Sequence, residues 1–291
     1  EALSRGMAID DFAPRIAFNF SVFNNVLEEV AKFRAARRLW ARMLRQRYGA
    51  KNPRSLTFRT GAGSGGSTLV AQQPQNNVVR VTLHTVIAAM AGVQSMHTAS
   101  MDEAHALPSE EAATLALRTQ QIVAYESGLA DVIDPLGGSY YVEKLTDQIE
   151  EQAEEYLKRI EERGGMVAAI ESGWVVREIG EEAFRFQREV EQGDRVVVGL
   201  NRFTTEESPP IELHRPDPTV ASGVKAEVDE LRKQRDNKAF LRALDDLKAV
   251  ASEGGNLMHP TLEAIRSLAT VGEVSGALRE IFGEWQAPAV Q

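Results

Sequence analysis

Three short segments within the first hundred residues alternate between polar and apolar side chains. In the first, RIAFNFSV at 15–22, the odd-numbered residues are mostly polar and the even-numbered residues are all apolar. The segments SLTFRTG at 55–61 and VQSMHT at 93–98 follow the same pattern. Because successive side chains of a β-strand point to opposite faces, the pattern predicts three strands, each with one polar face.

A longer segment with helical spacing follows each predicted strand, at 24–48, 75–92 and 109–127. Strands that alternate with helices favour parallel pairing in an α/β fold. Parallel strands buried on both faces are usually almost continuous Val, Ile and Leu, whereas these carry Arg, Asn, Ser, Thr, Gln and His on one face. The polar face predicts a TIM-like barrel whose interior holds water or a polar ligand in place of branched apolar side chains.

The rest of the chain is predicted to be a mostly helical extension. Amphipathic spacing predicts helices at 143–163, 165–172, 178–192, 223–253, 259–269 and 272–283. DRVVVGLNRF at 194–203 is typical of an edge strand, and the Pro-rich segment after it is typical of a linker. We therefore expect three regions: barrel units at 1–127, a helical wrap with an edge strand at 128–203, and a linker with partner-contacting helices at 204–291.

Composition and charge narrow the classes of function. The 291 residues carry a formal net charge of −9, which argues against nucleic acid as the main partner. The basic segment 32–47 could still meet phosphates, but its interleaved apolar residues favour the solvated side of an amphipathic helix. Without cysteine there is neither a disulfide framework nor a thiolate metal site. No segment resembles a signal peptide or a membrane span, so we expect a cytoplasmic location and no membrane partner.

Two other features carry less weight. Residues 61–67 have the glycine spacing of a phosphate-binding loop, but Ser67 stands at the lysine position and no helix is expected before residue 75. We therefore do not expect nucleotide binding there. The five histidines lack a metal-ligand spacing, and we expect His97 to line the mouth of the barrel.

Only three strand–helix units are predicted, whereas a complete (β/α)₈ barrel takes ~250 residues for eight. The first unit follows closely on Glu1, and the chain does not begin with methionine. We expect this chain to be the C-terminal part of a larger barrel protein, containing its last three β/α units.

Long ungapped motifs over residues 7–285 resemble a known family. They are APRIAF, FRAARRLWARMLRQRYGAKNPRS, STLVAQQPQNNVVRVTL, VQSMHTASMDEA, LRTQQIVAYESGLADVIDPLGGSYYVEKLTDQIEE and RVVVGLNRF. They are similar to the large, catalytic subunit of methylmalonyl-CoA mutase and to isobutyryl-CoA and 2-hydroxyisobutyryl-CoA mutases. The resemblance implies a barrel that encloses an acyl-CoA substrate along its axis, adenosylcobalamin as cofactor, and a radical isomerisation of the carbon skeleton.

The resemblance also implies partners. One is the N-terminal half of the barrel, and another is a small cobalamin-binding subunit or domain whose DxHxxG histidine ligates cobalt, a motif this chain lacks. The assembly would be a dimer or a heterotetramer. The family's Tyr-His pair and its carboxylate-binding arginine would lie on strands outside this chain, so no catalytic residue is assigned here.

Matched position by position, the resemblance implies functions for five residues. Arg15 and Gln94 would bind the acyl-CoA, and an arginine at the carboxyl end of a strand suits phosphate or carbonyl oxygens. Glu103 would hold the ribose hydroxyls of the adenosyl group, with Ala106 and Gly66 against the corrin ring. Two structural alternatives stay open: Gln94 as a satisfied barrel residue, and Glu103 as an ordinary acid in the first turn of a helix.

The chain departs from the family pattern in the expected loop after Arg59. Relatives carry Arg-x-His-x-Gln-Thr-(Ser/Ala/Gly)-Gly, whereas RTGAGSGG places Gly61 at the histidine position and Gly63 at the glutamine position. Because those side chains line the cavity in the family, we expect a roomier cavity with fewer hydrogen-bond donors. Ala17 similarly replaces a serine of the CoA-contacting strand.

The favoured interpretation is part of an adenosylcobalamin-dependent acyl-CoA mutase of the methylmalonyl-CoA to succinyl-CoA type. The departures at Gly61, Gly63 and Ala17 leave open a catalytically altered subunit that serves assembly or cofactor delivery. A cobalamin-independent barrel enzyme that binds CoA is the other alternative.

Overall fold

The computed structural model describes residues 2–206 and 211–287. The chain divides into two compact units, which we call unit 1 (Glu1–His214) and unit 2 (Arg215–Gln291). Unit 1 contains all the described strands, and unit 2 is helical. Within the described ranges, no helix has both the length and the apolar character that crossing a membrane requires.

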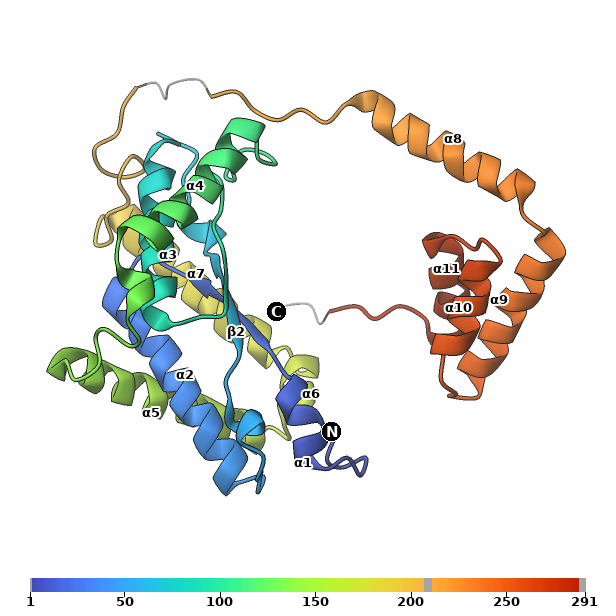
Figure 1. Ribbon diagram of the computed structural model, residues 1–291, viewed down its shortest axis with the longest axis horizontal. Helices are drawn as coiled ribbons and strands as arrows, with labels where there is room; N and C mark the ends of the chain where they lie inside the picture. The colour runs from blue at the N-terminus through green and yellow to red at the C-terminus, as the bar shows by residue number, and fades with distance from the viewer. Residues whose placement is uncertain (1, 207–210, 288–291) are drawn as a thin grey trace. The chain divides into compact units, whose positions relative to one another are not determined.

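A three-stranded parallel sheet organises unit 1 (Figure 1). Its strands, in spatial order, are β1 (Phe18–Val22), β2 (Thr60–Ser64) and β3 (Ser95–His97). A long helix follows each strand: α2 (Val26–Gln46), α3 (Asn76–Ala91) and α4 (Glu110–Glu126). The predicted α/β class, the parallel sheet and the three strand–helix units are therefore confirmed.

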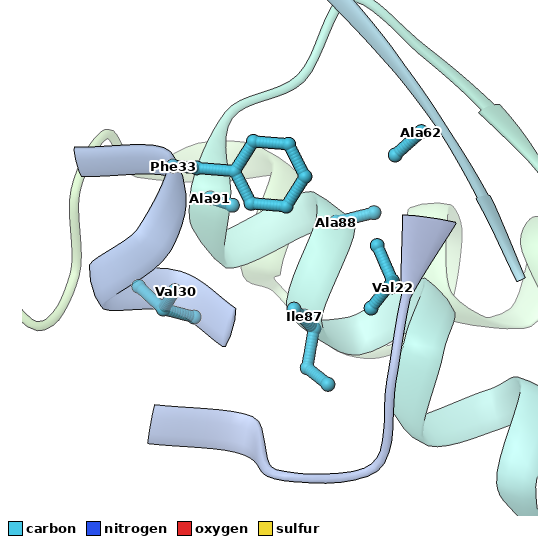
Figure 2. Close-up of a cluster of buried hydrophobic side chains, with 7 residues drawn as sticks. All are labelled: Val22, Val30, Phe33, Ala62, Ile87, Ala88 and Ala91. Atoms are coloured by element: carbon cyan, nitrogen blue, oxygen red, sulfur yellow. The ribbon is translucent and has the colours of Figure 1, made fainter. Parts of the chain in front are cut away.

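One face of the sheet packs against α2 and α3 to form the main core of unit 1 (Figure 2). The cluster consists of Val22 and Ala62 from the strands, Val30 and Phe33 from α2, and Ile87, Ala88 and Ala91 from α3, all at most 3% exposed. Phe20 adds an edge-to-face contact with the Phe33 ring, at 5.8 Å between centroids. Because apolar burial is the dominant favourable contribution to folding, this contact fixes which face of the sheet meets the helices.

The opposite face carries polar side chains in register across the sheet, and we call it the polar face. It consists of two rows of paired residues, Asn19–Gly61–Ser95 and Ser21–Gly63–His97. The four side chains of these rows are all exposed. The prediction that the strands have one polar and one apolar face is confirmed for β1 and β3.

The predicted starts of the first two strands are wrong. β1 begins at Phe18 because Pro14 opens a 3₁₀ turn, η1 (Ala13–Arg15), ahead of it. β2 lies at Thr60–Ser64 because Pro53 opens another turn, η2 (Pro53–Leu56), in which the Asn52 side chain accepts the Arg54 N–H. Gly61 and Gly63 are therefore inside the central strand and not in a loop.

Helix α2 lies along α5 (Tyr140–Glu162) through a row of ion pairs. The pairs are Arg34 with Asp134 and Glu143, Arg38 with Asp147 and Glu150, Arg42 with Glu150 and Glu154, and Arg47 with Glu161. Arg38 and Arg47 are exposed, as expected for the solvated side of an amphipathic helix, and all four arginines also contribute ion pairs to this helix packing. Their guanidinium groups already have carboxylate partners, which argues against phosphate binding by this segment.

The remaining elements of unit 1 are short helices and turns and one longer helix. They are α1 (Ile9–Phe12), η3 (Gly66–Thr68), η4 (Leu129–Asp131), α6 (Met166–Glu171) and α7 (Trp174–Gln192). The predicted edge strand at 194–203 is wrong, because it forms just one isolated bridge, Val198–Arg202, within the part of the chain that is described. The Asn201 side chain closes the segment as a turn by accepting the Val197 N–H at 2.8 Å.

The described residues of unit 2, 215–287, form four helices: α8 (Pro218–Gln234), α9 (Asn237–Ser252), α10 (Met258–Arg266) and α11 (Val271–Phe282). The prediction of one continuous helix at 223–253 is wrong. Arg235 is extended, and Asp236 caps a new helix by accepting the N–H groups of Lys238 and Ala239 at 2.9 and 3.2 Å. The last two predicted helices are confirmed as α10 and α11.

Candidate substrate and cofactor site

Parallel strands place the candidate site residues in two groups, one at each end of the sheet. The residues before the strands are Arg15, Arg59 and Gln94. The residues after the strands are Gly66, Glu103 and Ala106. A five-residue strand spans about 15 Å, so the candidate substrate and cofactor residues are separated by roughly that length. Arg15 lies at the amino end of β1, which corrects the expectation of a carboxyl-end position.

The three residues of the amino-end group differ in exposure and in their hydrogen bonds to the rest of the protein. Arg15 is exposed. Arg59 is half-buried, and its guanidinium donates to backbone carbonyl groups of the turn before β1. The Gln94 side-chain oxygen accepts the Thr60 N–H at 2.7 Å, and its backbone N–H donates to the Thr60 carbonyl at 2.9 Å. Gln94 therefore completes the pairing of β2 with β3, which is the structural role left open above, and substrate binding by Gln94 stays a prediction.

Gly61 and Gly63 leave the centre of the polar face without side chains. A Cβ atom at Gly61 would lie 2.7 Å from Ser95 Oγ and 3.4 Å from Asn19 Oδ1, so the neighbouring strands already occupy that position. A Cβ atom at Gly63 would have no heavy atom within 4 Å. Open space therefore exists at Gly63, toward the carboxyl end of β2, and not at Gly61.

At the carboxyl end, two glycines expose backbone between a carboxylate and an aromatic ring. A Cβ atom at Gly66 would lie 2.8 Å from Glu103 Oε1, and one at Gly65 would lie 2.8 Å from the ring of Phe23. Glu103 is exposed, and Phe23 is 40% exposed. Bare backbone beside an apolar ring fits the edge of a flat macrocycle, and a carboxylate accepts hydrogen bonds from ribose hydroxyls. These residues therefore fit the adenosyl side of adenosylcobalamin.

Two fully buried polar residues that the sequence analysis did not identify, Asn77 and Asp102, hold the loops of this carboxyl-end group. The Asn77 amide donates to the carbonyl groups of Val70 and Met101, both at 2.9 Å. Asp102 Oδ2 accepts the Ser109 N–H at 2.8 Å. Short polar side chains at helix starts and turns usually bond to their own segment, so long-range contacts of this kind have no distinct sequence signal.

The histidines take different places. His84 is fully buried with Nε2 2.8 Å from Asn24 Oδ1, and burial lowers its pKa to about 4, so the ring is neutral at pH 7. His97 is exposed on the polar face, and His105 bonds the Ala71 carbonyl at 2.9 Å. Among the residues that the structure describes, no three His, Cys, Asp or Glu side chains are grouped so as to hold a metal ion. The glycine segment 61–67 continues into η3 and not into a helix N-terminus, because α3 begins at Asn76.

These features define an α/β protein whose small parallel sheet has an exposed polar face, with one candidate group at each end of the strands. Residues 1–284 match the model of the methylmalonyl-CoA mutase family. The chain belongs to the methylmalonyl-CoA mutase family, which confirms the resemblance derived from its motifs.

Individual relatives give the extent of the match. The chain is 43% identical to the 2-hydroxyisobutanoyl-CoA mutase large subunit of Aquincola tertiaricarbonis, over 100% of this chain and 52% of that protein. It is 42% identical to the methylmalonyl-CoA mutase of Cereibacter sphaeroides, over 98% of this chain and 40% of that protein. It is 40% identical to the methylmalonyl-CoA mutase large subunit of Propionibacterium freudenreichii subsp. shermanii, again over 98% and 40%. The chain thus spans about half or less of the length of these relatives.

Proposed function

We propose that this chain is the C-terminal part of the catalytic subunit of an adenosylcobalamin-dependent acyl-CoA mutase, which isomerises the carbon skeleton of its substrate. The observation that carries the proposal is the polar face, with a candidate cofactor group at its carboxyl end and an exposed arginine at its amino end. This arrangement suits an extended thioester that lies along the strands of a barrel. Residues 1–127 would form the last barrel units, 128–203 the helical wrap, and 204–291 the linker and partner-contacting helices.

When bound, adenosylcobalamin supplies the radical that starts the isomerisation. The protein's share is binding, orientation and exclusion of water. The Glu103 carboxylate would accept hydrogen bonds from the ribose hydroxyls, and Gly66 and Ala106 would let the corrin ring approach the backbone closely. At the other end, Arg15 would donate to CoA oxygens through its planar guanidinium, and Gln94 would bind the acyl-CoA at the same end of the sheet.

The sheet also supports the proposed partner, the N-terminal half of the barrel. Among the described residues, β1 and β3 each pair with β2 alone, so each has one free edge. A hollow of about 350 Å³ opens beside β3, lined by residues that include Met96, Gln120 and Leu129. Further strands on both edges would complete a closed wall around the polar face. A cobalamin-binding subunit or domain would supply the cobalt ligand.

A second candidate function is a catalytically altered subunit that serves assembly or cofactor delivery. Gly61 and Gly63 favour it, because the family's histidine and glutamine at these positions supply hydrogen bonds near the reacting groups. The retention of Glu103 and Gly66 in contact favours the active enzyme. Turnover of acyl-CoA by the complete enzyme distinguishes the two, whereas a cobalamin-independent enzyme would bind CoA and show no cobalamin binding.

The experiment that tests the cofactor site is Glu103→Ala in the complete enzyme. We expect this substitution to weaken the binding of adenosylcobalamin more than that of hydroxocobalamin, which lacks the adenosyl group. Loss of a hydrogen bond to a charged group costs about 1.5–3 kcal/mol, or roughly ten- to a hundredfold in Kd. The binding of each cobalamin is followed by its absorbance change.

Glu111→Ala is the matched control, because Glu111 is an exposed acid in the first turn of α4 and outside the candidate site. We expect it to leave both affinities unchanged. Equal weakening of the two cobalamins by Glu103→Ala would remove the proposed role of Glu103.

A further inference from the structure

One buried side chain joins the two loops that carry the candidate cofactor residues. Asn77, in the first turn of α3, is 0% exposed. Its amide nitrogen donates to the carbonyl groups of Val70 and Met101, both at 2.9 Å. Val70 follows Gly66 in the loop after β2, and Met101 precedes Glu103 in the loop after β3. A single amide therefore holds both loops.

Asp102 closes the second loop around Glu103. It is 0% exposed, its Oδ2 accepts the Ser109 N–H at 2.8 Å, and its carbonyl oxygen accepts the N–H groups of His105 and Ala106 at 2.8 and 3.1 Å. Its Oδ1 is buried without a hydrogen-bond partner among the described residues, which costs free energy. Stability alone therefore does not account for a carboxylate at this position.

We propose that Asn77 and Asp102 are positioning residues that hold the Glu103 carboxylate in place against Gly66. The inference rests on the proposed binding of the adenosyl group by Glu103. Glu103 is exposed and lies on a loop. The position of its carboxylate therefore depends on how firmly the backbone on either side is held. The Asn77 and Asp102 bonds fix that backbone before the ligand arrives, which reduces the ordering cost of binding.

The test measures, in the complete enzyme, the Kd of adenosylcobalamin and of hydroxocobalamin. We expect Asp102→Ala and Asn77→Ala each to reduce the preference for adenosylcobalamin about tenfold, since a displaced carboxylate loses its hydrogen bonds. Asp102→Asn keeps an oxygen that can accept the Ser109 N–H, and we expect it to retain most of the preference. Ile87→Ala is the control for lost stability, because Ile87 is a fully buried core residue of α3. We expect it to weaken both cobalamins alike.

Glu103→Ala distinguishes failure of this inference from failure of the proposed function. If Asp102 acts through Glu103, adding Asp102→Ala to Glu103→Ala leaves the preference unchanged. A Glu103→Ala enzyme that loses the preference, while Asp102→Ala and Asn77→Ala enzymes keep it, overturns the positioning role alone. A Glu103→Ala enzyme that keeps the preference overturns the proposed binding of the adenosyl group by Glu103 and this inference together.

Folding of the variants is checked independently of cobalamin. In the cofactor-free enzyme, we expect hydrogen exchange of the backbone amides at 98–109 to be faster in the Asp102→Ala variant and unchanged in the Ile87→Ala variant. Equal protection of these amides in the two variants would contradict the positioning role. If Asp102→Ala does not fold, Asp102→Ser carries the same expectations, because its shorter side chain withdraws the acceptor from Ser109.

Discussion

Gly61 and Gly63 differ in their surroundings although both are bare positions of the polar face. Ser95 Oγ and Asn19 Oδ1 crowd the place of a Gly61 side chain, whereas nothing crowds that of Gly63. Glycine destabilises a strand, because it has no side chain to pack and gives the unfolded chain more conformational entropy. Glycine at a strand position is therefore explained when another group needs the space of its side chain. At Gly61 the neighbouring strands use the space, and at Gly63 it is open to a ligand.

This difference predicts unequal effects of restoring the family's side chains. We expect Gly61→His to lower the free energy of unfolding by about 1–3 kcal/mol, because Ser95 and Asn19 must move. We expect Gly63→Gln to change it by less than about 0.5 kcal/mol while altering turnover or substrate preference. Urea unfolding and acyl-CoA turnover of the complete enzyme measure the two effects.

The matched control is Gly61→His combined with Ser95→Gly, which removes the crowding atom and is expected to recover part of the lost stability. A Gly63→Gln enzyme with unchanged stability, turnover and preference would mean that the open space at Gly63 lies away from the substrate.

The sequence predicts single residues that belong to a recognised motif. It does not predict residues whose role depends on a three-dimensional contact. The motifs named Glu103 and Gly66, and their close approach across two loops came from the structure alone. The sequence placed Gln94 near the substrate, but could not reveal that its side chain completes the backbone bonding of Thr60. Asn77 and Asp102 were missed because their partners lie on other segments or seven residues away.

At the scale of elements, helices were predicted more closely than strands. A helix is fixed by its own periodicity and caps, and α2, α3 and α4 agree with their predicted ranges to within two residues. The second strand was misplaced because Leu56 and Phe58 alternate like a strand, while the true strand is rich in glycine and is defined by bonds to both neighbours. Tertiary pairing overrides local strand propensity there.

The packing of α2 on α5 predicts a strong dependence on one carboxylate. Glu150 is 4% exposed and lies between Arg38 and Arg42, the latter at 2.8 Å. We expect Glu150→Ala to lower the free energy of unfolding by about 1.5–3 kcal/mol, because it removes a hydrogen bond from Arg38 and an ion pair with Arg42 in a buried setting. Chemical unfolding of the complete enzyme measures the loss.

Glu161→Ala is the comparison for that prediction. The Arg47–Glu161 pair is 48% exposed on both sides, and exposed pairs contribute about 0–1 kcal/mol. A loss from Glu161→Ala as large as that from Glu150→Ala would show that burial does not set the strength of these pairs.

In unit 2, Arg235 between α8 and α9 pairs with Glu273 in the first turn of α11, and this contact predicts that the stability of unit 2 depends on pH. Hydrogen bonds from Arg235 are the main cause that lowers the pKa of Glu273 from 4.5 to about 2, helped by Thr270 and Arg232 and opposed by burial. Because the folded-state pKa is depressed, the stabilisation is complete above about pH 4.5 and is lost as the pH falls toward 2.

We expect Glu273→Gln to destabilise unit 2 at pH 7 by about 1–2 kcal/mol, a figure reduced for partial solvent exposure, and to flatten the loss of stability between pH 4.5 and 2. Hydrogen exchange of the α11 amides as a function of pH measures it. Glu263→Gln, which removes an exposed i,i+3 pair with Arg266, should leave the profile unchanged. An identical acid profile for Glu273→Gln and the unmodified protein would contradict the assignment.

At the scale of the whole molecule, the sequence indicated the class of architecture because alternation of strands and helices is a property of long segments. Among the described residues, the outer edges of β1 and β3 have no strand partner, so these residues do not define how many strands a complete barrel would have. The structure therefore shows the polar face of the sheet. That a complete barrel encloses this face stays a proposal.

These free edges predict that the chain is not stable without the rest of the barrel. An unpaired parallel edge exposes a row of N–H and C=O groups, and Tyr125, Ile133 and Tyr140 are 86–98% exposed on α4, α5 and the segment between them. Expressed alone, the chain is expected to aggregate or to lose fixed tertiary packing, and co-expression with the complementary N-terminal half is expected to restore a soluble, cooperatively unfolding complex. Size-exclusion chromatography and near-ultraviolet circular dichroism distinguish these states. A chain that is monomeric and unfolds cooperatively by itself would contradict the proposal that its sheet is one part of a larger barrel, because such a sheet would have no need of further strands.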